Sequence, residues 1–123
     1  MIGDGNKTLA ATSTWLGALF ESLVVQSVRV YAETARANVS HLRVDHGRTS
    51  REVDLVVEGD DRRIVAIEVK LVGTVTDRDV RHLNWLHQQV GERLADKIVI
   101  NTGTYAYRRP DGVAVIPLAL LGN

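Results

Sequence analysis

Two apolar runs separated by a short polar loop constrain the fold of this chain most. The runs are residues 52–57 (Glu-Val-Asp-Leu-Val-Val) and residues 64–70 (Ile-Val-Ala-Ile-Glu-Val-Lys). β-Branched runs with a turn-like spacer predict two antiparallel strands joined as a hairpin. If residues 59–63 form the loop, Glu58 lies opposite Ile64, and the same register places Asp54 opposite Glu68.

The rest of the chain alternates between helical and strand-like patterns. Apolar residues spaced three and four apart predict amphipathic helices over residues 15–35 and 76–94. Thr76-Asp77 is predicted to cap the second helix, and Leu94 is predicted to be the last residue of its buried apolar stripe. Strands are predicted at residues 39–44 and 97–101. A hairpin is predicted from residues 105–108 and 113–116 around Pro110-Asp111-Gly112. On the second helix, Trp85 is predicted to turn away from the core. There it either anchors an interface or is covered by the C-terminal hairpin or the leader.

Composition limits the class of protein. A length of 123 residues suits one domain, with a flexible leader over residues 1–14 and the folded domain over residues 15–123. The absence of cysteine excludes disulfides and thiolate zinc sites. The chain shows no secretory signal and no apolar stretch long enough to span a bilayer, which predicts a cytoplasmic protein without membrane contact. The four histidines are predicted to be surface or packing residues.

Charged side chains inside the two central strands point to a site. Alternation places Lys70 on the face of Asp54 and Glu68, while Val53, Leu55, Ile67 and Val69 point the other way. Directly opposed carboxylates, roughly 5 Å apart at Cβ, repel each other unless a cation neutralises them. Mg²⁺ or Mn²⁺ suits carboxylate ligands, and Glu21, at the margin of the first helix's apolar stripe, is positioned to assist. The alternative is a solvated sheet surface on which Lys70 alone neutralises the pair.

These residues resemble a known motif. Val53-Asp54-Leu55, followed after thirteen residues by Glu68-Val69-Lys70, is similar to the D…ExK half of the PD-(D/E)xK nuclease motif, and Glu21 matches an additional acidic residue found in many members. Residues 16–25, 51–57, 105–107 and 115–118 resemble the C-terminal domain of unknown function, family 4143, attached to bacterial and archaeal AAA-type ATPases. This second resemblance covers residues 15–121.

The resemblance implies a restriction-endonuclease-like, three-layer α/β/α fold with a central mixed sheet. It also implies a Mg²⁺-dependent phosphodiesterase acting on DNA, in which Asp54, Glu68, the carbonyl of Val69 and Glu21 bind the metal and Lys70 acts on the attacking water. The chain departs from the motif at Val53, where many members have proline, and it has no phosphate loop. The alternative function is a catalytically silent module that regulates, or mediates interaction with, an AAA-type ATPase. A homodimer is a further expectation.

Overall fold

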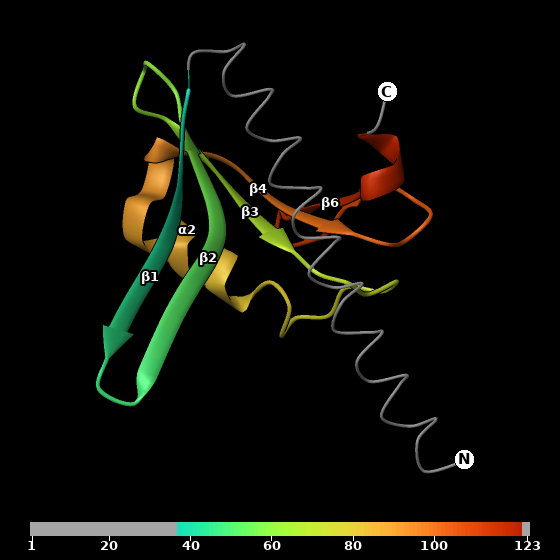
Figure 1. The fold of residues 1–123 in the computed structure, drawn as a ribbon, viewed down its shortest axis with the longest axis horizontal. Coiled ribbons are helices and arrows are strands. Elements are labelled where there is room, and N and C mark those ends of the chain that lie inside the picture. Colours follow the sequence, from blue (N-terminus) through green and yellow to red (C-terminus); the bar gives the residue numbers. More distant parts are fainter. Residues whose placement is uncertain (1–36, 122–123) are drawn as a thin grey trace, which may run out of the picture.

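The computed structural model describes residues 37–121, in which the apolar runs form one six-stranded sheet and one α-helix (Figure 1). The strands are β1 (Asn38–His46), β2 (Thr49–Glu58), β3 (Ile64–Val69), β4 (Leu94–Asn101), β5 (Tyr107–Arg108) and β6 (Ala114–Pro117). The helix is α2 (Arg81–Val90), and the 3-10 turns are η1 (Gly91–Arg93) and η2 (Leu118–Leu120). The helix expected over residues 15–35, which includes Glu21, and the leader over residues 1–14 lie outside the described residues.

The sheet is mixed, as predicted, with the order β1-β2-β3-β4-β6-β5. Its first half is an antiparallel meander, since β1 pairs with β2 and β2 with β3. β3, β4 and β6 run parallel, and β5 closes the edge antiparallel to β6. The predicted C-terminal hairpin is confirmed, because Tyr107 pairs with Val115 and Arg108 with Ala114. The parallel pairing of β6 with β4 was not foreseen from the sequence.

The predicted register of β2 and β3 is confirmed. Glu58 pairs with Ile64, and the ladder continues to Leu55 opposite Ile67. The intervening loop is closed by two backbone hydrogen bonds of 3.0 Å between its ends, in which Gly59 donates to Arg63 and Arg62 to Gly59. Loop length and alternation therefore fix this hairpin, and Asp54 and Glu68 are the next residues beyond its last pair.

A β-bulge interrupts β2 just beyond that ladder. Ser40 pairs with Val56 and Leu42 with Val53, so β2 carries one residue more than β1 over the same length. The extra residue reverses the alternation of side chains along β2. Val53 consequently lies in the core beneath α2, whereas Leu55 lies in the core on the opposite face. The expectation that Val53 and Leu55 share a face is therefore wrong.

The second helix is shorter than its apolar pattern predicts. Residues 77–80 form turns, and α2 begins at Arg81 rather than near Thr76. The backbone N–H and the hydroxyl of Thr76 both bond to Oδ2 of Asp79, at 2.8 and 3.1 Å, and these bonds stabilise the turn that precedes the helix. Gly91, with φ of 57°, ends the helix, and Leu94 is the first residue of β4 rather than part of the helical stripe.

Two clusters of buried side chains occupy the two faces of the sheet. The cluster under α2 contains Val53, Ile64, Ala66, Val75, Val80, Leu83, Leu86, Leu94, Val99, Val113 and Val115. The cluster on the opposite face contains Leu55, Ile67 and Ile100, with Leu118 and Leu121 packed against it. Burial on both faces explains why β3 is almost continuously apolar. No helix in the described range is long and apolar enough to cross a membrane.

Trp85 belongs to the packing around the first cluster. It is half-buried against that cluster, and the guanidinium of Arg51 lies 5.7 Å from the centre of its ring. The expectation that Trp85 turns away from the core is therefore wrong. A helical wheel gives only the angular position of each side chain, whereas the contact with Arg51 depends on where β2 lies in the folded chain. This removes the reason for expecting a homodimer through Trp85.

Candidate functional site

The site begins with Asp54 and Glu68, which the β2–β3 hairpin brings together. Oδ2 of Asp54 accepts a hydrogen bond of 2.8 Å from the backbone N–H of Val69. That bond fixes the Asp54 carboxylate beside the residue that follows Glu68. The side chain of Glu68 is buried, with the residue only 4% exposed. The two carboxyl groups interact electrostatically, as the sequence register predicts.

Burial makes Glu68 an unusual carboxyl group. Burial away from water and, to a smaller extent, repulsion from Asp54 raise the pKa of Glu68 from its ordinary value of 4.5 to about 8, although the nearby Lys70 ammonium opposes this rise. Without a cation, Glu68 is therefore mostly protonated at neutral pH. Its Oε1 atom has no hydrogen-bond partner among residues 37–121. A buried oxygen without a partner is costly, so the fold alone does not account for this side chain.

Lys70 lies on the same face as Glu68, as predicted. Its Nζ is 3.8 Å from Oε2 of Glu68, and its backbone N–H donates a 2.9 Å bond to the carbonyl of Ile100. The backbone bond continues the pairing with β4 one residue beyond the end of β3. Lys70 is thus held in place while its side chain stays partly exposed. The ion pair is long and engages only one oxygen of Glu68.

A pocket of about 250 Å³ opens beside these two residues. It is lined by Glu68, Lys70, Arg78, Asp79, Arg81 and His82. Three of the lining side chains are permanent cations, and guanidinium groups suit the oxygens of a phosphate. Sequence inspection missed Arg78 and Arg81. The signal for them is topological, because a parallel crossover places the start of its helix beside the carboxyl end of the preceding strand.

His82 supports the wall of this pocket from α2. Its Nδ1 lies 2.7 Å from the carbonyl oxygen of Glu52 and 3.2 Å from the backbone nitrogen of the same residue. Its Nε2 accepts a 3.2 Å bond from Nε of Arg81. The histidine therefore packs β2 against α2, which matches its predicted role, and it also orients Arg81 at the pocket.

A second buried acceptor lies at the neighbouring strand end. Asn101 is the last residue of β4, and its Oδ1 has no partner within the described part of the chain. Its Nδ2 is 3.5 Å from the carbonyl of Gly73. Gly103 approaches the same loop so closely that a Cβ would lie 2.9 Å from that carbonyl. The loops after β3 and β4 are therefore packed together at the carboxyl ends of these strands, where the site lies.

The carboxyl pair fits a divalent cation. A cation would take the place of the proton on Glu68 and give Oε1 the partner that it lacks. Within residues 37–121, no group of three or more His, Asp or Glu side chains is arranged to hold a metal. The described chain therefore supplies two carboxylates, Asp54 and Glu68, and the third predicted acid, Glu21, lies outside it.

The fold and this site define the class of protein: a mixed-sheet α/β domain with an acidic pair and a lysine at the end of a central strand. A family model described as "Domain of unknown function (DUF4143)" matches residues 16–121, and the chain belongs to that family. Comparison with curated proteins finds no match.

Among solved structures, the chain is similar to one chain of a "Refined half-complex from tetradecameric assembly of Thermococcus gammatolerans McrB AAA+ hexamers with bound McrC". The TM-score is 0.51 at 11% sequence identity, and the match covers 87% of this chain. Identity this low shows a shared fold and nothing further. The match covers 29% of that longer chain, so this protein corresponds in fold to less than a third of it.

Proposed function

We propose that this protein is a metal-dependent phosphodiesterase that cleaves DNA, built on a three-layer, restriction-endonuclease-like α/β/α fold. The observation that carries the proposal is the buried Glu68 carboxyl, whose Oε1 lacks a partner, beside Asp54. A stabilising role does not explain this pair, because apolar residues of similar volume usually serve stability as well or better. A hydrolytic role explains it, since paired carboxylates hold the cations used in phosphoryl chemistry.

The side chains have distinct roles in this proposal. Asp54 and Glu68, with the carbonyl of Val69 and with Glu21, would hold Mg²⁺ or Mn²⁺. When bound, the cation would lower the pKa of a water molecule and would stabilise negative charge on the phosphate. Lys70, beside Glu68, orients the attacking water and assists its deprotonation.

The basic pocket supplies substrate binding. Arg78 and Arg81 contact the phosphate oxygens of the DNA strand, and His82 keeps Arg81 oriented toward the pocket. Phosphate contacts of this kind position the strand without reading its sequence. Since the formal net charge of the chain is zero, binding depends on this local patch rather than on an overall basic charge.

Cleavage assays test the proposal directly. Linear, circular and single-stranded DNA are incubated with the purified chain in Mg²⁺, in Mn²⁺ and in EDTA. We expect metal-dependent cleavage that falls by roughly a thousandfold in Asp54→Asn and Glu68→Gln, the equivalent of several kcal/mol of transition-state stabilisation. The exposed Glu92→Gln serves as a matched control and retains full activity. Cleavage that persists equally in the two site variants contradicts the proposal.

A second candidate is a module that regulates or docks on an AAA-type ATPase. The observation in its favour is the fold likeness to a chain of the McrB AAA+ assembly. Sedimentation velocity of the chain, mixed with an AAA-type ATPase encoded beside it, tests this function. Co-sedimentation, together with a changed rate of ATP hydrolysis and no DNA cleavage in any metal, supports the module. Cleavage by the isolated chain favours the nuclease.

A further inference from the structure

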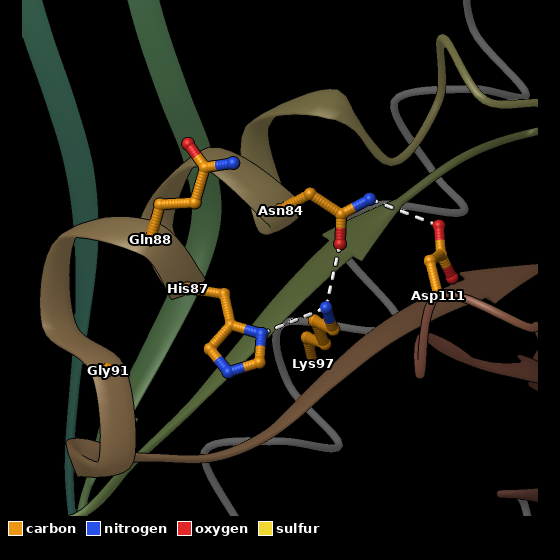
Figure 2. Close-up of a pocket in the computed structure, with 6 residues that line it drawn as sticks. All are labelled: Asn84, His87, Gln88, Gly91, Lys97 and Asp111. Atoms are coloured by element: carbon orange, nitrogen blue, oxygen red, sulfur yellow. Dashed lines mark hydrogen bonds between the residues drawn. The ribbon is translucent and has the colours of Figure 1, made fainter.

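Lys97 is a buried cation on the α2 face of the sheet. It belongs to β4, is 7% exposed, and pairs in register with Ala66 of β3. Figure 2 shows its side chain rising between two residues of α2. Nζ donates a 2.8 Å bond to Oδ1 of Asn84 and lies 3.0 Å from Nδ1 of His87. Because an ammonium group can only donate, His87 accepts through Nδ1 in this contact.

No carboxylate in the described part of the chain lies within ion-pair distance of Lys97, although the adjacent Asp96, which is bonded to Arg108, attracts its charge from farther away. None of the ion pairs formed by residues 37–121 includes it. The nearby Asp111 bonds instead to Nδ2 of Asn84 at 3.0 Å and pairs with Nε of Arg109 at 3.3 Å. An ammonium group has three donors, and only two acceptors from the described chain meet this one. A buried charge without an opposite charge is costly unless something compensates it.

Lys97 lines an open pocket of about 420 Å³. Its lining consists of Asn84, His87, Gln88, Gly91, Lys97 and Asp111. The pocket shares no lining residue with the pocket beside Glu68. It is therefore a separate site, and it does not depend on the proposed nuclease activity.

We propose that this pocket binds a singly charged oxyanion, a carboxylate or a phosphodiester group, on the Nζ of Lys97. The third N–H of the ammonium group donates to the anion, and the anion's charge offsets the buried positive charge. Asp111 sets the limit on ligand charge. Its carboxylate lines the same pocket, so a second negative charge on the ligand would be repelled.

Nuclear magnetic resonance titration tests the site with defined probes. Sodium acetate and sodium dimethyl phosphate are added at constant ionic strength, with sodium chloride as the reference. We expect saturable shifts of the amide signals of Asn84, His87 and Gly112, which adjoin Lys97. Saturation by both probes indicates recognition of the single charge, and saturation by one alone identifies the ligand chemistry. Inorganic phosphate, which is largely doubly charged at pH 8, should bind several-fold more weakly than dimethyl phosphate.

Two variants separate binding from structure. Lys97→Met keeps the aliphatic length of the side chain and should weaken the anion response by at least about tenfold. Asp111→Asn removes the opposing charge while keeping the size and planar shape of the side chain, and should strengthen the response several-fold. Arg63→Met, which removes an exposed cation in the β2–β3 loop, is the matched charge control and should change nothing. The proposal is overturned if neither probe saturates, or if folded Lys97→Met responds like the parent protein.

Discussion

The backbone N–H of Val69 donates a hydrogen bond of 2.8 Å to Oδ2 of Asp54. This contact ties the two strands of the central hairpin together at the point where their regular ladder has ended. It also holds one carboxylate against a second, buried carboxylate, that of Glu68, with Lys70 on the open side.

Divalent cations should stabilise the folded protein. At a Mg²⁺ or Mn²⁺ concentration of about a hundred times the dissociation constant, binding to the native state alone adds about 2.7 kcal/mol to the free energy of unfolding. Thermal melting with increasing metal concentration measures this effect. Asp54→Ala and Glu68→Ala should abolish the response, whereas Glu92→Gln should keep it. If the melting temperature of the parent protein changes with neither metal, the cation site is ruled out.

The metal-free protein should lose stability as the pH rises. The pKa of Glu68 is about 8 in the folded state against an ordinary value of 4.5, so the folded state holds a proton that the unfolded state has released. The free energy of unfolding therefore falls between about pH 4.5 and pH 8. Urea denaturation in EDTA at pH 5.5 and pH 8.5 measures the difference.

Glu68→Gln is the control for this pH dependence, since its amide cannot titrate. The variant should show a flatter profile and should be more stable than the parent at pH 8.5. The pKa values of Asp96 and Asp111 are lowered by their partners, chiefly an Arg108 hydrogen bond for Asp96 and an Asn84 hydrogen bond for Asp111. The contributions of Asp96 and Asp111 to the free energy of unfolding therefore change only at lower pH, and they do not alter the pH dependence caused by Glu68. Identical profiles for the parent and Glu68→Gln would refute the prediction.

Replacement of Lys70 should separate binding from chemistry. Lys70→Met removes the positive charge that holds down the pKa of Glu68, so that pKa should rise and the loss of stability should move to higher pH. Metal binding should persist, because both carboxylates remain. Cleavage should slow by roughly 10²–10⁴-fold if Lys70 acts on the water. A variant that cleaves at the parental rate, with an unchanged pH midpoint for stability, would remove Lys70 from the site.

Trp85 should contribute to stability rather than to association. Trp85→Ala removes a half-buried ring from the cluster under α2 and should lower the free energy of unfolding by about 2 kcal/mol. Arg51→Ala should cost about 0.5–1 kcal/mol through loss of the cation–π contact. A double-mutant cycle in urea should show coupling between the two. Light scattering before and after Trp85→Ala checks for a change of mass, which would restore the interface role.

Local sequence patterns determined the central hairpin and its acidic pair. The length of the loop from Gly59 to Arg63 and the period of two in the flanking strands set the register, because both properties act over a few residues. The same reasoning placed Lys70 with Glu68 and located the C-terminal hairpin. These features could be predicted because the residues that specify them are close together in the chain.

Tertiary structure decided the features that depend on partners distant in the chain. Pairing with β1 created the bulge that moves Val53 to the α2 face, and no pattern within β2 indicates it. The crossover from β3 to β4 brought Arg78 and Arg81 to Glu68 and buried Lys97 beneath α2. A lysine in a strand is normally exposed, and only the packing of a helix over its neighbours removes it from water. Burial is a property of the assembled layers, and for that reason it gives Glu68 and Lys97 chemistry that their sequence neighbours do not reveal.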